Sequence, residues 1–260
     1  MNLLLDIGNT NLRWALQVGE VLGEVGTVRH GGGVPLDLLA AWESLEPPGR
    51  VLVSNVGGVA VAGALRRVVR ALWGVEPESV AVQGSCLGLR VAYADPSRLG
   101  VDRWLALLGA HTGVSGSALI VDAGTAVTYD LMLAGGRHLG GLILPGIALM
   151  RGALLQGTHL PPLDLDAEPQ TCLEPPWGTD TAAAVAGGGL QALGALAERL
   201  YDRLAQSARV GSGVGTEGAP PRLLLTGGDA ERLAPLIGRP LEIVPDLVLR
   251  GLARLAGGPG

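Results

Sequence analysis

The chain has 260 residues, of which 48% are hydrophobic, and a formal net charge of −5. This balance argues against a disordered chain and against a nucleic-acid binder that relies on a broad basic face. All 19 basic residues are arginine, which excludes lysine-dependent phosphate loops, protein-kinase chemistry and Schiff-base catalysis. No apolar run reaches the roughly 18 residues of a membrane span, and the N-terminus has no basic signal-peptide region, so we expect a cytoplasmic protein without membrane contact.

The first thirty residues predict three short strands around a polar turn. An apolar run over 3–5 leads into Asp6-Ile7-Gly8-Asn9-Thr10, residues 11–18 alternate with period two, and residues 21–28 return. Glycine lets backbone N–H groups come close to an anion, and threonine can donate a hydrogen bond to a phosphate oxygen. An isolated turn of this kind is usually an ordinary hairpin connection, so the functional interpretation depends on a second copy.

Residues 34–82 predict alternating helices and strands, which is typical of an α/β fold. We expect helices over 34–44 and 60–72 and strands over 50–56 and 80–82. The strand over 50–56 contains Ser54 and Asn55 near its carboxyl end, where ligands bind in α/β folds.

A loop bounded by Pro96 and Gly100 leads into a helix that we expect to begin at Val101. Asp102 and Arg103 therefore lie in the first helical turn, where the helix N-terminus favours an anion. An aspartate here can accept a proton from a substrate hydroxyl, and an arginine offers a forked donor to a carboxylate or phosphate. On spacing alone, the alternative is a helix-end charge with a surface partner.

The second half begins after Ser115-Gly116-Ser117 and repeats the order of the first. An apolar run over 118–121 leads to Asp122-Ala123-Gly124-Thr125, and its aspartate lies 116 positions after Asp6 (122 minus 6). An aspartate at the end of a strand can hold a metal ion or a positioned water. The two related turns predict two halves that face one polyphosphate.

The rest of the chain predicts connecting segments and one more glycine turn. Thr226-Gly227-Gly228 follows an apolar strand and precedes a helix, so its backbone forms a flat ledge suited to a nucleoside. We also expect an irregular crossover over 158–176, a helix over 182–204 with Thr181 as its N-cap, a flexible loop over 208–221, and a closing strand and helix.

Four segments together closely resemble the type III pantothenate kinases, over nearly the whole chain: Asp6–Thr10, Gly100-Val101-Asp102-Arg103, Asp122–Thr125 and Thr226–Gly228. That family belongs to the acetate and sugar kinase, heat-shock chaperone and actin superfamily. The resemblance implies an α/β fold of two ribonuclease-H-like domains with a cleft between them, which we place at residues 1–115 and 116–260. It also implies transfer of the ATP γ-phosphoryl group to pantothenate, the first step of coenzyme A synthesis, by a homodimer.

The resemblance further implies roles for particular residues. Asp102 would be the general base, Asp122 would bind a monovalent cation, K⁺ or NH₄⁺, and Asp6 would orient Mg²⁺ through water. The residues implied for ATP are Asp6, Ile7, Gly8, Asn9, Thr10, Asn11, Leu12, Arg13, Thr125, Gly227 and Gly228. Those implied for pantothenate are Tyr93, Gly100, Val101, Asp102, Arg103, which would hold the carboxylate, and Thr181, which follows Asp180 where the family commonly has Asn or Ser.

Two other interpretations remain open at this point. A sugar or acetate-type kinase of the same superfamily is disfavoured by the Gly-x-Asp-Arg loop and by the short chain. A regulatory or interaction protein with the same fold, similar to the Bvg accessory factors, is disfavoured by the intact Asp6, Asp102, Arg103 and Asp122.

Overall fold

The computed structural model describes residues 1–260 except 113–115, 161–176, 212–218 and 258–260. The chain divides into two compact units: unit 1 is Met1–Gly113 with Asp246–Gly260, and unit 2 is Val114–Pro245. The sequence placed residues 246–260 with the second half, whereas the structure joins them to the first. The reason is the last helix, α7 (Leu247–Ala256), whose apolar side packs on α3 (Val101–Thr112) and β1 (Asn2–Ile7) of unit 1.

The sheet of unit 1 has the strand order β3-β2-β1-β5-β6, with β4 paired to β2. Strand β1 runs antiparallel to β2 and parallel to β5. The strand expected over 80–82 is wrong, because pairing with β5 involves Glu78 and Ser79 and ends with the hydrogen bond from the Val80 N–H to the Val53 carbonyl. The strands are β1 (Asn2–Ile7), β2 (Asn11–Val18), β3 (Val21–Leu22), β4 (Gly26–Arg29), β5 (Arg50–Asn55) and β6 (Glu78–Ser79).

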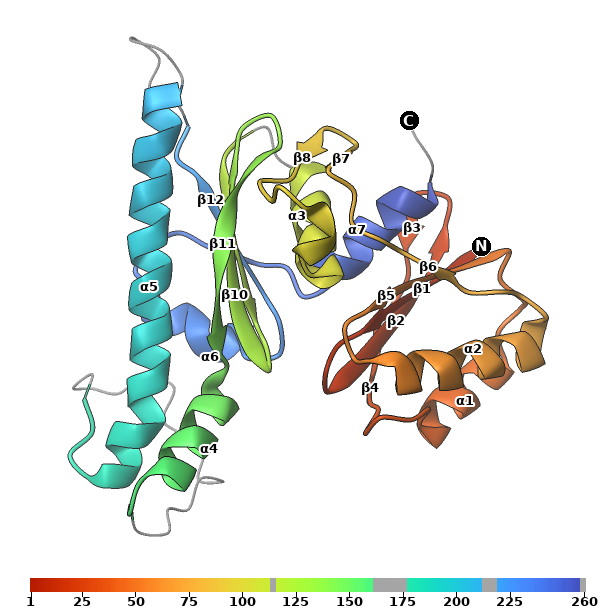
Figure 1. Ribbon diagram of the computed structural model, residues 1–260, viewed down its shortest axis with the longest axis horizontal. Coiled ribbons are helices and arrows are strands. Elements are labelled where there is room, and N and C mark those ends of the chain that lie inside the picture. Colours follow the sequence, from red (N-terminus) through yellow and green to blue (C-terminus); the bar gives the residue numbers. More distant parts are fainter. Residues whose placement is uncertain (113–115, 161–176, 212–218, 258–260) are drawn as a thin grey trace. The chain divides into compact units, whose positions relative to one another are not determined.

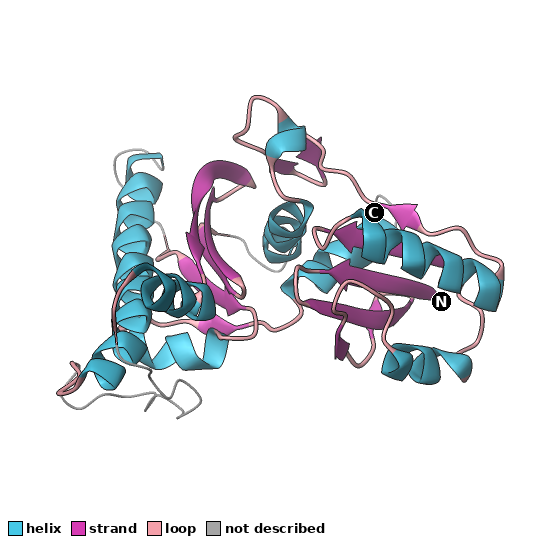
Figure 2. Ribbon diagram, turned by 60° about the horizontal axis from the view of Figure 1, so that its bottom comes forward, coloured by secondary structure: helices cyan, strands magenta, loops and turns pink. Residues whose placement is uncertain are grey.

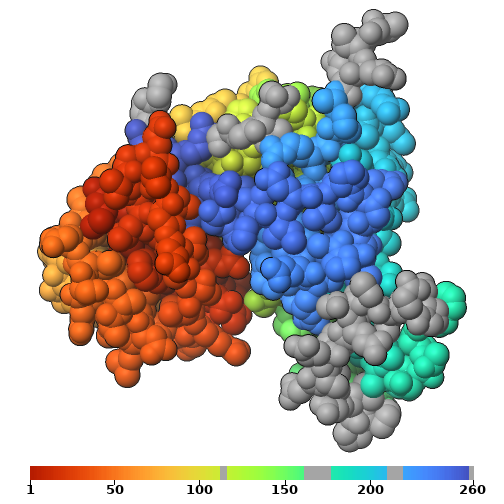
Figure 3. All heavy atoms as spheres, turned by 180° about the vertical axis from the view of Figure 1, so that it is seen from behind, coloured from red at the N-terminus to blue at the C-terminus, as the bar shows by residue number. Residues whose placement is uncertain are grey.

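The alternation of β1 decides the layers of unit 1. Leu3, Leu5 and Ile7 form one core with helices α1 (Leu36–Glu43) and α2 (Val59–Trp73). Successive side chains of a strand point to opposite faces, so Leu4 and Asp6 face the side that carries α3 (Val101–Thr112) and α7. Figures 1 and 2 show helices on both sides of these strands, and the segment with α1 and α2 forms an exposed orange surface in Figure 3.

Helices α3 and α7 pack backbone to backbone through two glycines. A Cβ on Gly109 would come 2.3 Å from the Leu247 carbonyl oxygen, and one on Gly251 would come 2.1 Å from the Leu105 carbonyl oxygen. Unit 1 also contains the strands β7 (Ser85–Cys86) and β8 (Leu89–Arg90) and the short helix η1 (Pro96–Arg98). The helix predicted to begin at Val101 does begin there, which places Asp102 and Arg103 in its first turn.

Unit 2 follows the same plan. Its strands lie in the order β13-β12-β9-β10-β11, with β9 antiparallel to β10 and parallel to β12. Leu119, Val121 and Ala123 of β9 form a core with the long helix α5, so Asp122 faces the opposite side. The elements are β9 (Ala118–Ala123), β10 (Ala126–Leu133), β11 (Arg137–Pro145), α4 (Ile147–Gly157), α5 (Thr181–Gly211), β12 (Arg222–Thr226), α6 (Ala230–Leu233), η2 (Ala234–Leu236) and β13 (Glu242–Ile243).

Two expectations about α5 are wrong. Its N-cap is Asp180, whose Oδ1 accepts the Ala183 N–H at 2.8 Å, so Thr181 is already the first helical residue. The helix also continues to Gly211, through the first part of the loop expected over 208–221. The rest of that loop over 212–218, residues 113–115 at the expected boundary, and residues 161–176 of the expected crossover lie outside the described residues.

Candidate active site

The first polar turn, residues 8–10, is held by hydrogen bonds to its backbone. The Gly8 N–H donates to the Asn11 carbonyl oxygen at 2.9 Å, and the His30 N–H donates to the Thr10 carbonyl oxygen at 3.2 Å. The His30 ring nitrogen Nε2 lies 2.8 Å from the Gly8 carbonyl oxygen. Neither the period of β4 nor a motif singles out His30, so sequence reasoning missed this residue.

A second missed residue, Gly57, lies against the same turn. A Cβ on Gly57 would come 2.3 Å from the Gly8 carbonyl oxygen, so only glycine allows this approach. Asn55 shapes the loop that carries Gly57, because its Oδ1 accepts the Gly57 N–H at 3.0 Å and its Nδ2 donates to the Gly58 carbonyl at 3.2 Å. The polar end of β5 thus supports the turn through its own local geometry.

The predicted ATP residues around this turn differ in how deeply they are buried. Asp6 is half-buried and lies in register between Arg13 of β2 and Ser54 of β5. Ile7 and Leu12 are fully buried in the core, so a ligand could meet them only through their backbone. Gly8 and Thr10 are half-buried, and Asn9 and Asn11 are exposed.

Three of the predicted pantothenate residues, Tyr93, Asp102 and Arg103, lie together at the start of α3. The Asp102 Oδ1 accepts the Arg103 N–H at 2.8 Å. A Cβ on Gly100 would come 2.6 Å from that same Oδ1, so the glycine leaves room for the carboxylate. The Arg103 side chain is buried, and its Nη1 donates to the Tyr93 hydroxyl at 3.1 Å. Its guanidinium carbon also lies 6.0 Å from the centre of the Tyr93 ring, within the range of a cation–π contact.

In unit 2, the second turn is closed by backbone contacts from two other segments. The Gly124 N–H donates to Ala126, the Gly146 N–H donates to the Thr125 carbonyl at 2.9 Å, and the Asp229 N–H donates to the Ala123 carbonyl at 2.9 Å. A Cβ on Gly146 would come 2.1 Å from the Gly124 carbonyl oxygen. This glycine therefore serves close packing of the turn itself.

Gly227 lies directly beside the Asp122 carboxylate. Its φ of +92° is one that L residues rarely adopt, and a Cβ there would come 2.5 Å from Asp122 Oδ1 and 2.3 Å from the Ala123 carbonyl oxygen. By contrast, Gly228 is exposed and has open space where a Cβ would stand. The structure thus joins two predicted segments, Asp122–Thr125 and Thr226–Gly228, into one site within unit 2.

Charged side chains lie directly after the Gly227–Gly228 turn in the sequence. Arg232 donates from Nη1 to Asp229 Oδ1 at 2.7 Å, and Arg151 of α4 donates from Nη2 to the Ala186 carbonyl at 3.0 Å. Burial, with a smaller effect of the Arg232 charge, lowers the pKa of the Arg151 guanidinium. Sequence reasoning missed this group because its members come from α4, α5 and the start of α6, which are far apart in the sequence.

Thr181, the last predicted pantothenate residue, is exposed on the first turn of α5. It lines a shallow hollow of about 560 Å³ together with Leu154 of α4 and Val185 of the same helix. Because Asp180 caps the helix, the Thr181 hydroxyl is not needed for the capping role expected from the sequence.

The oxygen donors present suit hard cations. Asp122 lies in register between Thr128 of β10 and Thr226 of β12, and these three side chains share one sheet face. Carboxylate and hydroxyl oxygens are the donors that such cations take. Among the described residues, no three His, Cys, Asp or Glu side chains gather at a common point. A single carboxylate such as Asp6 still fits Mg²⁺, which keeps several waters and binds substrate phosphates.

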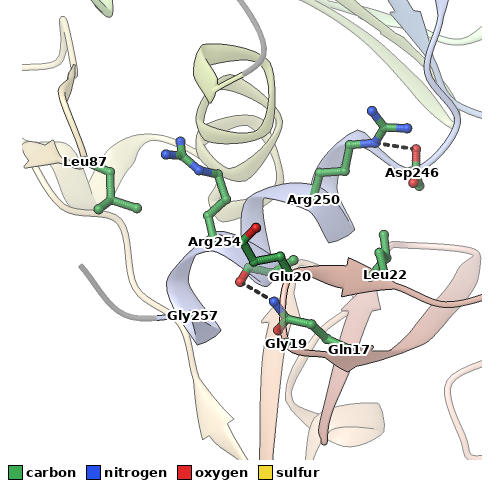
Figure 4. A pocket seen from close by; sticks show the side chains of 10 residues that line it. Gln17, Gly19, Glu20, Leu22, Leu87, Asp246, Arg250, Arg254 and Gly257 are labelled. Atoms are coloured by element: carbon green, nitrogen blue, oxygen red, sulfur yellow. Dashed lines mark hydrogen bonds and ion pairs between the residues drawn. The ribbon is translucent and has the colours of Figure 1, made fainter. Parts of the chain in front are cut away.

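A separate cavity of about 810 Å³ lies in unit 1, between the β2–β3 connection, Leu87 and α7 (Figure 4). Gln17 borders it and donates to the Ala253 carbonyl at 2.9 Å, and Arg250 pairs with Asp246. Gln17 pairs with Asn2, at the opposite end of the β1–β2 ladder from Asp6 and Arg13. None of the predicted site residues lines this cavity.

Two curled α/β units, each with an aspartate turn at the end of its central strand, define the fold of the actin-like ATPases and sugar kinases. An activator of 2-hydroxyisocaproyl-CoA dehydratase from Clostridium difficile, solved with bound ADPNP, has this fold, with a TM-score of 0.51, 14% identity, and coverage of 98% of this chain and 94% of its own. A Campylobacter jejuni protein described as a Baf family transcriptional activator matches with a TM-score of 0.55 and 21% identity, over 97% and 96% of the two chains.

The family model of the type III pantothenate kinases matches residues 2–203. The type III pantothenate kinase of Nitrosococcus oceani is 36% identical over 262 aligned positions, which cover 98% of this chain and 94% of that protein. The chain belongs to the type III pantothenate kinase family. The family and the fold class expected from the four motifs are therefore confirmed. In the described part of the chain, no helix combines the length and the apolar character needed to span a bilayer.

Proposed function

We propose that the chain phosphorylates pantothenate to 4′-phosphopantothenate with ATP, as the first step of coenzyme A synthesis, and that the predicted residues carry out this reaction. The family membership supports the kinase activity. The observation that carries the residue assignment is the contact between Tyr93 and Arg103 beside Asp102. It puts a buried guanidinium donor and a carboxylate base next to each other on one helix turn.

In the proposed mechanism, Arg103 binds the pantothenate carboxylate, and Tyr93 orients the guanidinium. The terminal hydroxyl of pantothenate lies at Asp102, which accepts its proton as the oxygen attacks the γ-phosphorus, the bond to the β–γ bridging oxygen breaks and ADP leaves. Gly100 keeps the carboxylate free to take this position, because any side chain there would collide with Asp102 Oδ1.

The two aspartate turns hold ATP in this proposal. The Asn9 backbone N–H of the first turn and the Thr125 hydroxyl donate to phosphate oxygens, and the Gly227–Gly228 backbone supports the nucleoside. Bound Mg²⁺ at Asp6 and a monovalent cation at Asp122 would supply the positive charge that a chain without lysine lacks.

We also propose a cytoplasmic homodimer with Thr181 near the subunit interface. Exposed apolar side chains on β11 and α4 support the dimer, because contact with a second subunit would remove their apolar surface from water. These are Leu142, Ile143, Leu149 and Leu154.

A coupled ATPase assay with and without pantothenate, in K⁺ buffer, tests the proposal. We expect ATP turnover only with pantothenate and K⁺, and little activity when Na⁺ replaces K⁺. Phosphorylation of a hexose but not of pantothenate would refute the substrate, and equal rates in Na⁺ alone would refute a selective site at Asp122. A regulatory role is not favoured, because the Campylobacter jejuni protein is 21% identical and its likeness supports the fold alone.

A further inference from the structure

We propose that His30 is a positioning residue for the ATP phosphates, which acts through the backbone of the turn at residues 8–10. This inference rests on the proposed function, because that function assigns the turn to ATP. His30 directly follows β4 and is 6% exposed. Strand β4 pairs with β2 at the end where β2 leaves the turn, so Asn11 lies opposite Arg29 and the next residue, His30, reaches Thr10.

Two hydrogen bonds fix the protonation state of the His30 ring. A carbonyl oxygen only accepts hydrogen bonds, so Nε2, 2.8 Å from the Gly8 carbonyl oxygen, carries the hydrogen. The Gly32 N–H donates to Nδ1 at 3.0 Å, so Nδ1 is unprotonated. Only the neutral ring with its hydrogen on Nε2 satisfies both bonds. Since the His30 N–H also donates to Thr10, one residue holds the first and the last residue of the turn.

The geometry of the peptide unit carries this contact to the ligand side. The Gly8 carbonyl and the Asn9 N–H belong to one planar trans unit and point in opposite directions. The carbonyl points inward, to the His30 ring and to the closely packed Gly57. The Asn9 N–H therefore points outward, at an exposed residue, where a phosphate oxygen can accept it. A donor that is aimed before the anion arrives needs no reorganisation on binding.

Two substitutions separate the two ring nitrogens. Asparagine at position 30 places its Oδ1 near the position of Nδ1 but has no donor that reaches Gly8, whereas glutamine places its Nε2 near the position of the histidine Nε2. We expect H30N to weaken binding of a non-hydrolysable ATP analogue about tenfold, because the half-buried Gly8 carbonyl loses its donor. H30Q should stay within about threefold of the wild type, since it keeps a donor to Gly8.

Isothermal titration calorimetry with the analogue, and the KM for pantothenate, are the readouts. The KM for pantothenate should not change in H30N. A general loss of structure, by contrast, would change this KM as well. H111N is the matched control, because His111 belongs to the same unit but lies in the last turn of α3, beside Gly88, and it should bind the analogue like the wild type. Wild-type affinity in H30N, or equal losses for ATP and pantothenate, would overturn the role of His30.

Binding does not require turnover, so the experiment distinguishes this inference from the proposed function. The expected binding pattern without phosphorylation of pantothenate would support His30 and refute the proposed function, whereas a wild type that binds no nucleotide would overturn both. If H30N does not fold, nitrogen NMR of the wild-type ring decides. We expect a single tautomer with hydrogen on Nε2, whose signal shifts when the analogue is added, and an unchanged signal would overturn the inference.

Discussion

Replacing Gly227 by alanine puts a methyl group where the structure leaves no space for one. At φ of +92°, the new Cβ would stand 2.3 Å from the Ala123 carbonyl oxygen and 2.5 Å from Asp122 Oδ1. The left-handed backbone costs an L residue about 1–2 kcal/mol, and relief of the overlap by a backbone shift costs about 1–3 kcal/mol more. We therefore expect G227A to lower the free energy of unfolding by about 2–5 kcal/mol.

Gly228 provides the matched control for this prediction. A methyl group at this position would meet no atom of the described residues within 4 Å, and its φ is not positive, so G228A should change the free energy of unfolding by less than about 0.5 kcal/mol. Urea denaturation followed by circular dichroism measures both variants. The backbone shift that relieves the overlap in G227A also moves the Asp122 carboxylate. The K⁺ concentration for half-maximal activity should therefore rise in G227A but not in G228A. Equal stabilities of the two variants would refute the close packing of Gly227 on the Asp122 turn.

Three further predictions concern the start of α3 and of α5. D102N should keep its affinity for ATP but lower kcat by a factor on the order of 10²–10⁴, and near-wild-type turnover would exclude a general base at this position. Y93F removes the hydroxyl that accepts from Arg103, so steady-state kinetics should show a KM for pantothenate raised by about three- to tenfold, and an unchanged KM would contradict the orienting contact. D180A should lower the free energy of unfolding by about 1 kcal/mol without a change in the KM for pantothenate, whereas T181A should raise that KM without loss of stability. If denaturation curves and kinetics give the reverse, Thr181 and not Asp180 is the N-cap.

The local parts of the fold were readable from the sequence. The apolar runs before Asp6 and Asp122 form the central strands β1 and β9, and the helix after Gly100 begins at the expected residue. These segments can be predicted because a strand end, a glycine and a helix start are each determined by a few adjacent residues. The motifs they carry were also sufficient to identify the family.

The residues that stabilise the site from other segments could not be predicted from the sequence in the same way. His30 and Gly57 both stabilise the first turn, although they follow Gly8 by 22 and 49 positions in the sequence (30 minus 8 and 57 minus 8). Neither residue stands out among its sequence neighbours. Sequence periodicity reports which face a residue occupies, but not which backbone atom it meets across the sheet. Such contacts become visible only when strand register is known.

The remaining differences have local physical reasons. Asp180 and Thr181 are both good capping residues, and the choice depends on which side chain reaches the Ala183 N–H. Residues 208–211 continue α5 although glycine and serine surround them, because an established helix adds each further residue at little cost.

The assignment of α7 to unit 1 has a consequence for how the chain is made. Unit 2 is continuous in sequence, so all of its elements lie within residues 114–245. Unit 1 begins earlier but is complete only with α7, which follows residue 245, packs on β1 and receives Gly109 of α3. Domains generally fold as units during synthesis, so the half of the protein that is translated first is the half that is completed last. A chain truncated after residue 245 should therefore expose the N-terminal sheet to proteases while unit 2 is resistant.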